Sequence, residues 1–135
     1  MAAWQASYAI IPAGPFPADY RAQLDSMLPR SKSWSGELEL WGQEDGNCVH
    51  VHLERGQPTD GVLRVDLRSV DSDFIRHILD FLSSMKFGLE DTAGNWVDPN
   101  LGEFTLALKR SSAYRFVENP DQFFRRLIAG GLEDA

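Results

Sequence analysis

The sequence contains one cysteine, Cys48, so no disulfide bond can form within the chain. It also lacks any apolar run near the roughly 20 residues that a membrane-spanning helix needs. The first residues, Met1–Ala6, carry neither the basic start nor the apolar stretch of a signal peptide. Internal repeats and low-complexity segments are absent too. These absences predict a cytoplasmic protein that does not act in a membrane.

Positive charge is scarce: 13 Lys and Arg stand against 20 Asp and Glu, giving a formal net charge of −7. This balance argues against binding to nucleic acid or to an anionic membrane surface, because both need a basic surface. Residues 36–108 hold fourteen of the acidic residues and five of the basic ones. This concentration of acidic residues indicates either an ordinary solvated surface or an acidic face that meets a basic partner. The length of 135 residues predicts a single domain, 1–135.

Three segments near the middle of the chain alternate apolar and polar residues, which is typical of half-buried strands. They are residues 37–41, 48–54 and 62–68, with loops at 43–47 and 55–61. A further strand is expected at 4–12, helices at 17–28 and 71–86, a short hairpin at 87–97, and a last helix from Asn119-Pro120. Asn100 can cap another helix. Residues 103–109 fit either a strand or a helix, and the absence of β-branched residues from 109–114 favours helix. This order predicts an α+β fold: a largely antiparallel sheet with helices packed on one face, forming a two-layer sandwich.

The pair Asp45-Gly46 is typical of a two-residue hairpin turn. Such a turn predicts Trp41 opposite His50 and Glu39 opposite His52. One register of the next hairpin places His50 opposite Asp66 and His52 opposite Arg64. The alternation then predicts a core face made of Leu38, Leu40, Val49, Val51, Leu53, Leu63, Val65 and Leu67. It predicts a polar face made of Glu37, Glu39, Trp41, Cys48, His50, His52, Glu54, Arg64, Asp66 and Arg68.

A tryptophan on a polar sheet face is either covered by a loop or exposed as a binding anchor. Trp34 is close in sequence to Trp41 and could join it; in the alternative, the loop at 30–36 folds over the face. We predict a protein-binding surface on this face. Its residues are Glu37, Glu39, Trp41, Glu44, Asp45, His50, His52 and Asp66.

The same face carries residues that could bind a metal ion or act in catalysis. Cys48, His50 and His52 alternate along one strand, and His-x-His is a known metal-ligand spacing, to which Asp66 or Glu39 could add a carboxylate. Cys48 beside His50 could also form a nucleophile and base. However, no complete zinc-ligand set, oxyanion device or calcium-binding loop is visible. We therefore predict no catalytic residue, no metal and no cofactor.

Two stretches resemble parts of small, uncharacterised bacterial proteins. One is 111–120 (Ser-Ser-Ala-Tyr-Arg-Phe-Val-Glu-Asn-Pro) followed by Phe123-Phe124. The other is 89–95 (Leu-Glu-Asp-Thr-Ala-Gly-Asn) followed by Asp98-Pro99. Some such proteins are immunity proteins of bacterial toxin systems. The resemblance covers about a third of the chain, contains no catalytic signature and transfers no functional residue. It implies an immunity protein that inhibits a cognate toxin.

Three functional hypotheses follow. The first is a protein-binding module whose acidic, Trp-bearing sheet face blocks a basic toxin. The alternative is an enzyme or a small-ligand or metal-binding protein that uses His50, His52 and Asp66. The third is a homodimer formed by pairing of exposed strands. The first two differ in concavity, because an enzyme needs a walled pocket whereas a protein-binding face can be broad.

Overall fold

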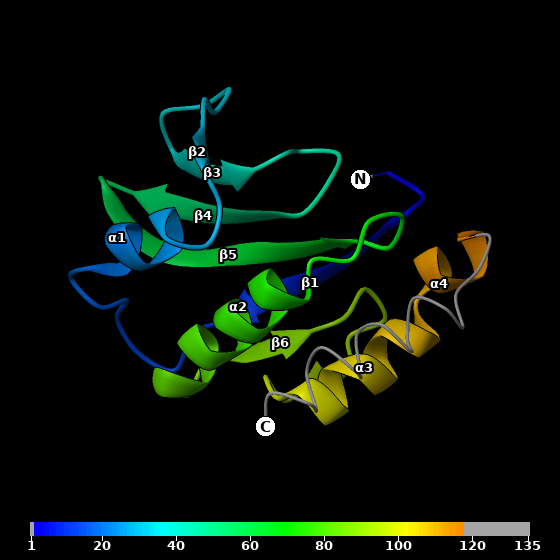
Figure 1. Ribbon diagram of the computed structural model, residues 1–135. Helices are drawn as coiled ribbons and strands as arrows, with labels where there is room; N and C mark the ends of the chain where they lie inside the picture. The colour runs from blue at the N-terminus through cyan, green and yellow to red at the C-terminus, as the bar shows by residue number, and fades with distance from the viewer. Residues whose placement is uncertain (1, 118–135) are drawn as a thin grey trace.

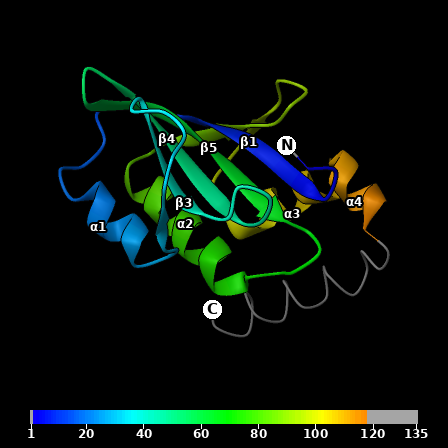
Figure 2. The ribbon, with the colours of Figure 1, turned by 90° about the horizontal axis from the view of Figure 1, so that it is seen from above.

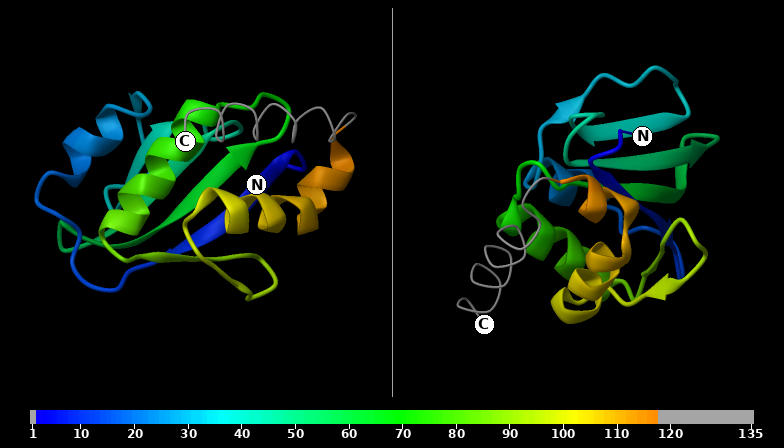
Figure 3. Two further views of the ribbon diagram at one scale, coloured as in Figure 1. Left: turned by 60° about the horizontal axis from the view of Figure 1, so that its bottom comes forward. Right: turned by 90° about the vertical axis from the view of Figure 1, so that its right-hand side faces the viewer.

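A computed structural model describes residues 2–117 of the chain. In this part, antiparallel strands form one sheet in the spatial order β2-β3-β4-β5-β1-β6-β7. The helices lie on one side of the sheet (Figure 1; Figure 3, right), with α2 between α1 and α4 (Figure 2). The predicted α+β fold is therefore confirmed. The strands are β1 (Gln5–Ile11), β2 (Arg30–Ser31), β3 (Leu38–Gly42), β4 (Cys48–Glu54), β5 (Gln57–Asp66), β6 (Gly88–Glu90) and β7 (Trp96–Val97); the helices are α1 (Tyr20–Asp25), α2 (Ser72–Ser84), α3 (Leu101–Arg110) and α4 (Ser112–Phe116).

The core lies between the sheet and the helices. The apolar stripe predicted for the 71–86 helix forms α2, where Phe74, Ile78 and Leu82 are almost completely buried. Asp71 caps α2 by accepting a hydrogen bond from the Phe74 backbone N–H at 3.0 Å. From the sheet, the Tyr8 ring packs on Phe104 of α3 with centroids 5.0 Å apart. Each fully buried side chain of this size contributes about 1.5–3 kcal/mol to folding.

The ambiguous segment 103–109 is helical and belongs to α3. Asn100 caps α3 as predicted, accepting from the Glu103 backbone N–H at 2.9 Å. The helix ends where Ser111 becomes extended (φ −74°, ψ 152°), and Ser111 then caps α4 by accepting from the Tyr114 N–H at 3.3 Å. This break between two short helices was not predicted. The helix predicted from Asn119-Pro120 lies outside the described residues.

The predicted register of β3 against β4 is wrong by one residue. Trp41 lies opposite Val49, and Leu40 lies opposite His50. The cause is the turn: the Gln43 N–H donates to the Asn47 carbonyl at 3.1 Å, so Glu44–Gly46 is a three-residue loop. A shift of one residue exchanges the two faces of a strand. Glu39 and Trp41 therefore face the helices, and Leu38 and Leu40 face away from them.

The second predicted register, which placed His50 opposite Asp66, is wrong by four residues. His50 lies opposite Val62 and His52 opposite Asp60. The predicted 55–61 loop is mostly strand, because the chain reverses at Arg55 (φ 54°) and Gly56 (φ 78°), two positive-φ residues typical of a tight hairpin turn. Pro58 is tolerated in β5 because the register shifts beside it, between His52 and Leu53.

Two smaller differences concern the segment before β3. The helix predicted to reach residue 28 ends earlier, since α1 covers only Tyr20–Asp25. The short strand β2 was not predicted, and it pairs Arg30 with Trp41. Among residues 2–117, none of the helices combines the length and the apolar character that crossing a bilayer requires.

Candidate functional site

The side of the sheet that faces away from the helices is the candidate site. We call it the open face. No helix of residues 2–117 packs on it (Figure 3, right). Its strand residues follow from the pairing register and include Gln5, Ser7, Ala9, Ile11, Ser31, Leu38, Leu40, Gly42, Cys48, His50, His52, Asp60, Val62, Arg64, Asp66, Gly88, Glu90 and Trp96.

One row of paired residues crosses the open face from β4 to β7. His50 pairs with Val62, Val62 with Ala9, and Ala9 with Glu90, which pairs with Trp96. Adjacent strands lie about 4.8 Å apart, so the row from β4 to β7 spans roughly 19 Å. The middle of this row is apolar and only partly covered, as Val62 is half-buried and Ala9 is exposed.

Trp34 covers the β4 end of the row. Its indole meets the His50 imidazole edge to face, with ring centroids 5.7 Å apart, yet 62% of Trp34 stays exposed. Hydrogen bonds among neighbouring serines and the backbone shape the loop that carries it: the Ser35 N–H donates to Ser33 Oγ at 3.0 Å, and the Glu37 N–H donates to Ser35 Oγ at 3.2 Å. The 30–36 loop thus folds over this face, as the alternative prediction stated.

Trp96 marks the β7 end of the row. Its indole packs over Gly88, where a Cβ atom would come within 2.0 Å of the ring, so a larger residue at position 88 would displace the indole. Trp96 Nε1 donates to Asp98 Oδ1 at 2.8 Å, which fixes the indole while 57% of the residue stays exposed. Trp96 was not considered as a site residue, because its two-residue strand gives no alternation from which to assign a face.

The loop between β3 and β4 folds over one corner of the open face. Gln5 Nε2 donates to the carbonyls of Glu44 and Gly46, at 2.9 and 2.7 Å. Trp4 Nε1 donates to the Asp45 carbonyl at 2.6 Å. These bonds hold the backbone of the loop and leave the Glu44 and Asp45 residues exposed. A polar recess of about 390 Å³ lies beside the loop, lined by Ala2, Gln5, Gln43, Glu44, Asp45 and Arg64.

The eight predicted binding residues do not share one face. Trp41 is fully buried in the core, where Nε1 donates to Asp25 Oδ1 at 2.8 Å. Glu39 also faces the helices; it accepts a hydrogen bond from the Tyr20 hydroxyl and pairs with Arg21 at 2.7 Å. The predicted acidic face bearing Trp41 is therefore wrong. Glu37 is exposed just before β3, and Glu44, Asp45, His50, His52 and Asp66 lie on the open face or on the loop at its corner.

Hydrogen bonds from Arg21 and Tyr20 determine the charge state of Glu39. Burial acts to raise the pKa of Glu39, but the hydrogen bonds from Arg21 and Tyr20 outweigh it and hold that pKa below its usual range. Burial, together with the hydrogen bond to Glu39, raises the pKa of Tyr20 to about 12. Glu39 is thus an ionised structural partner of α1 and is not free for a ligand.

His50 and Cys48 are buried next to each other, with Nε2 3.6 Å from Sγ. Burial, reinforced by the nearby positive charge of Arg64 and by His52, lowers the pKa of His50 to about 4. Burial raises the pKa of the Cys48 thiol to about 11. At neutral pH, both groups are uncharged, so Cys48 lacks the thiolate that nucleophilic attack or metal binding requires.

His52 and Asp66, which the enzyme or ligand-binding hypothesis groups with His50, each contact a different residue. His52 Nδ1 lies 2.5 Å from Asp60 Oδ1 on the neighbouring strand. Asp66 is buried and pairs with Arg68, whose Nη2 lies 3.0 Å from Oδ2. The structure does not bring His50, His52 and Asp66 together. Within residues 2–117, no three His, Cys, Asp or Glu side chains are placed to hold a metal ion.

Comparisons with known proteins give no relative. No family model, curated protein or solved structure matches the chain.

Proposed function

We propose that this protein binds another protein through its open face, with Trp34 and Trp96 as the aromatic anchors. The observation that carries the proposal is that these two tryptophans, 62% and 57% exposed, stand at the two ends of one residue row on the helix-free side of the sheet. Exposed tryptophans are costly in water and dominate the binding energy of many interfaces.

The distance across the open face from β4 to β7 fits an ordinary protein interface. A partner in a standard complex covers about 800 Å², a patch roughly 30 Å across. The roughly 19 Å between β4 and β7 places both tryptophans inside one such patch, with Val62 and Ala9 between them. The central strip is apolar and its borders are polar, which is the usual anatomy of an interface.

Charge complementarity favours a basic partner. Among the strand residues of the open face, Asp60 and Glu90 are exposed carboxylates and Arg64 is half-buried. Asp66 is buried and its charge is paired with Arg68. Glu44 and Asp45 add exposed carboxylates at the corner. A basic protein would be steered to such a surface, and its association would weaken as salt is added.

The more specific form of this proposal is that the partner is a basic toxin and this protein its immunity protein. Support for it comes from the sequence resemblance of 89–95 with Asp98-Pro99 and of 111–120 with Phe123-Phe124, and from the acidic charge. Blocking a toxin requires only a broad complementary surface and no chemistry. The neutral His50 and Cys48 and the ion-paired Asp66 are compatible with such a role.

A homodimer formed by strand pairing is less favoured. The edge strands of the described sheet, β2 and β7, have two residues each, so they offer few backbone groups to a second copy.

The test is capture of a partner from host lysate with tagged protein, repeated with Trp34→Ala and Trp96→Ala. Leu106→Ala is the matched control, since Leu106 is an exposed apolar residue (50%) on helix α3. We expect one basic protein in a stoichiometric complex. Each tryptophan variant should weaken it about 30-fold or more, and Leu106→Ala should not.

A second pair of variants tests the charge. Asp60→Asn with Glu90→Gln should slow association with the captured partner and reduce its salt dependence, whereas Asp80→Asn, at an exposed position of α2, should do neither. A partner that binds both tryptophan variants as tightly as the wild type would show that the open face is not the interface.

A further inference from the structure

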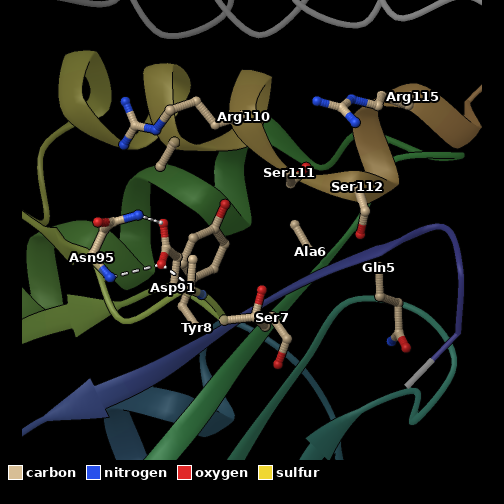
Figure 4. A pocket seen from close by; sticks show the side chains of 13 residues that line it. Gln5, Ala6, Ser7, Tyr8, Asp91, Asn95, Arg110, Ser111, Ser112 and Arg115 are labelled. Atoms are coloured by element: carbon tan, nitrogen blue, oxygen red, sulfur yellow. Dashed lines mark hydrogen bonds between the residues drawn. The ribbon is translucent and has the colours of Figure 1, made fainter.

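A second candidate site lies at the free edge of β1, beside α3 and α4, where the β6–β7 hairpin stops short. In the pairing register, β6 lies beside only the last residues of β1, Ala9–Ile11, so Gln5–Tyr8 have β5 on one edge and no strand on the other. A pocket of about 290 Å³ fills this notch (Figure 4). Its walls come from β1, from the 91–95 turn of the hairpin, and from the junction of α3 with α4.

Tyr8 supplies an unsatisfied group to this pocket. The residue is only 2% exposed, and its hydroxyl has no hydrogen-bond partner among the described residues. The ring is held by Phe104, which leaves the hydroxyl pointing away from the sheet toward α3 (Figure 4). A buried hydroxyl without a partner costs about 1–3 kcal/mol, so such a group in a native structure calls for an explanation.

The charge on the pocket wall is positive, in contrast to the acidic chain as a whole. Arg110 at the end of α3 and Arg115 of α4 both line the pocket. Among residues 2–117, neither arginine side chain makes a hydrogen bond or an ion pair. Their guanidinium groups are therefore available to a ligand.

Asp91 is the acidic residue on the wall, and its oxygens are already occupied. Oδ1 accepts hydrogen bonds from the N–H groups of Ala93 and Asn95 at 2.9 and 2.8 Å, and Oδ2 accepts from Asn95 Nδ2 at 3.2 Å (Figure 4). Burial acts to raise the pKa of Asp91, but these bonds from Asn95 and Ala93, with the charge of Arg110, hold it below its usual range. With one carboxylate and two guanidiniums, the wall has a net positive charge.

We propose that this pocket binds a small molecule through a phosphate or carboxylate group, with Arg110 and Arg115 pairing the anion and the Tyr8 hydroxyl donating a hydrogen bond to it. Guanidinium groups recognise both oxyanions, and charge-assisted hydrogen bonds are the stronger kind. Burial raises the pKa of Tyr8 above its usual range, so the phenol keeps the proton it donates. The volume of about 290 Å³ suits a small metabolite rather than a polymer.

The first test is titration of the protein with inorganic phosphate and, separately, with succinate, followed by amide NMR shifts at constant ionic strength. Saturable shifts at β1, the 91–95 turn and the α3–α4 junction, with millimolar or tighter affinity, are expected for at least one probe. Which probe binds separates the phosphate source from the carboxylate source. Linear shifts equal to those produced by chloride, with both probes, would overturn the proposal.

Variants locate the site. Arg110→Gln and Arg115→Gln should each weaken binding about tenfold or more, whereas Lys32→Gln, which removes an exposed charge on the far side of the sheet, should have no effect. Binding that survives both arginine substitutions unchanged would refute the assignment. Trp34→Ala should leave it intact, which separates this site from the protein-binding face.

Tyr8→Phe supplies a readout independent of affinity. Because the hydroxyl is buried without a partner, its removal should leave the stability of the ligand-free protein unchanged or increase it. The same variant should bind the anion several-fold more weakly. A Tyr8→Phe protein that loses stability without ligand and binds the anion like the wild type would show that the hydroxyl serves the fold instead.

Discussion

The indole of Trp34 stands edge-on to the imidazole of His50, with ring centroids 5.7 Å apart and an angle of 74° between the planes. Through this contact, a loop residue that is itself mostly exposed helps to bury a histidine to 4% exposure. The histidine is thereby kept neutral, and the tryptophan gains a fixed position on the open face. One contact thus connects the stability of the sheet to the surface that we propose for binding.

The first prediction concerns stability in mild acid. The pKa of His50 is about 4 in the folded protein and near 6.5 when the chain is unfolded. Between these values, the unfolded state binds more protons, so the contribution of His50 makes the free energy of unfolding fall as the pH drops from 6.5 to 4. The loss is on the order of 3 kcal/mol at most, from 1.4 kcal/mol per pKa unit.

Urea unfolding at pH 7.5 and pH 4.5 measures this effect. His77→Gln is the matched control, because His77 is exposed on α2. The wild type and His77→Gln should lose stability in parallel, and His50→Gln should lose clearly less. Equal losses in all three proteins would mean that His50 is protonated in the folded state like an exposed histidine.

The second prediction separates the observed β3–β4 register from the one predicted from sequence. Trp41 is fully buried and bonded to Asp25, so Trp41→Ala should cost about 3–5 kcal/mol of folding free energy. Trp34→Ala, at a residue 62% exposed, should cost about 1 kcal/mol or less. Denaturant unfolding of the two variants measures both values. Similar small losses in both would favour the register that places Trp41 on the outer face.

The β3–β4 hairpin shows what an alternating sequence pattern can predict and what it cannot. Alternation was enough to locate β3, β4 and the end of β5, and helical spacing located α2, because burial repeats locally along each segment. Alternation alone could not decide whether the loop has two residues or three. That one residue moves Trp41 from the surface to the core. The deciding interactions, from Tyr20 to Glu39 and from Trp41 to Asp25, are distant in sequence.

The candidate sites were harder to predict than the fold. The row of His50, Val62, Ala9, Glu90 and Trp96 depends on the order of five strands, and no local pattern encodes that order. The pocket is assembled from segments about a hundred residues apart, since Tyr8 lies on β1 and Arg115 on α4. Neither arginine differs in sequence from an ordinary surface residue. The missing hydrogen bond of Tyr8 becomes visible only in three dimensions.

The third prediction concerns the tight turn between β4 and β5, a region that the sequence pattern predicted to be a longer loop, 55–61. Gly56 has φ of +78°, a conformation that residues with a Cβ adopt at a cost, although no atom lies within 4 Å of the Cβ position. Gly56→Ala should therefore destabilise the protein by about 1 kcal/mol through the backbone alone. Gly14→Ala is the control, because that site is equally open and lacks a positive φ. It should leave the midpoint of thermal unfolding unchanged or raise it. If both alanine variants unfold at the same temperature, the β4–β5 turn does not require a left-handed backbone.

The last prediction concerns Cys48, the one cysteine of the chain. The residue is fully buried at the start of β4, directly after the β3–β4 loop and beside His50, and burial raises the pKa of its thiol to about 11 from an ordinary value of 9.0. At pH 8, the thiolate fraction falls about a hundredfold, and access to the sulfur is blocked as well. Iodoacetamide should therefore label the folded protein at least about a hundred times more slowly than it labels the protein in urea, with mass spectrometry as the readout. Labelling of the folded protein at the rate of a free thiol would show that the loop opens readily, and it would restore Cys48 as a candidate for chemistry on the open face.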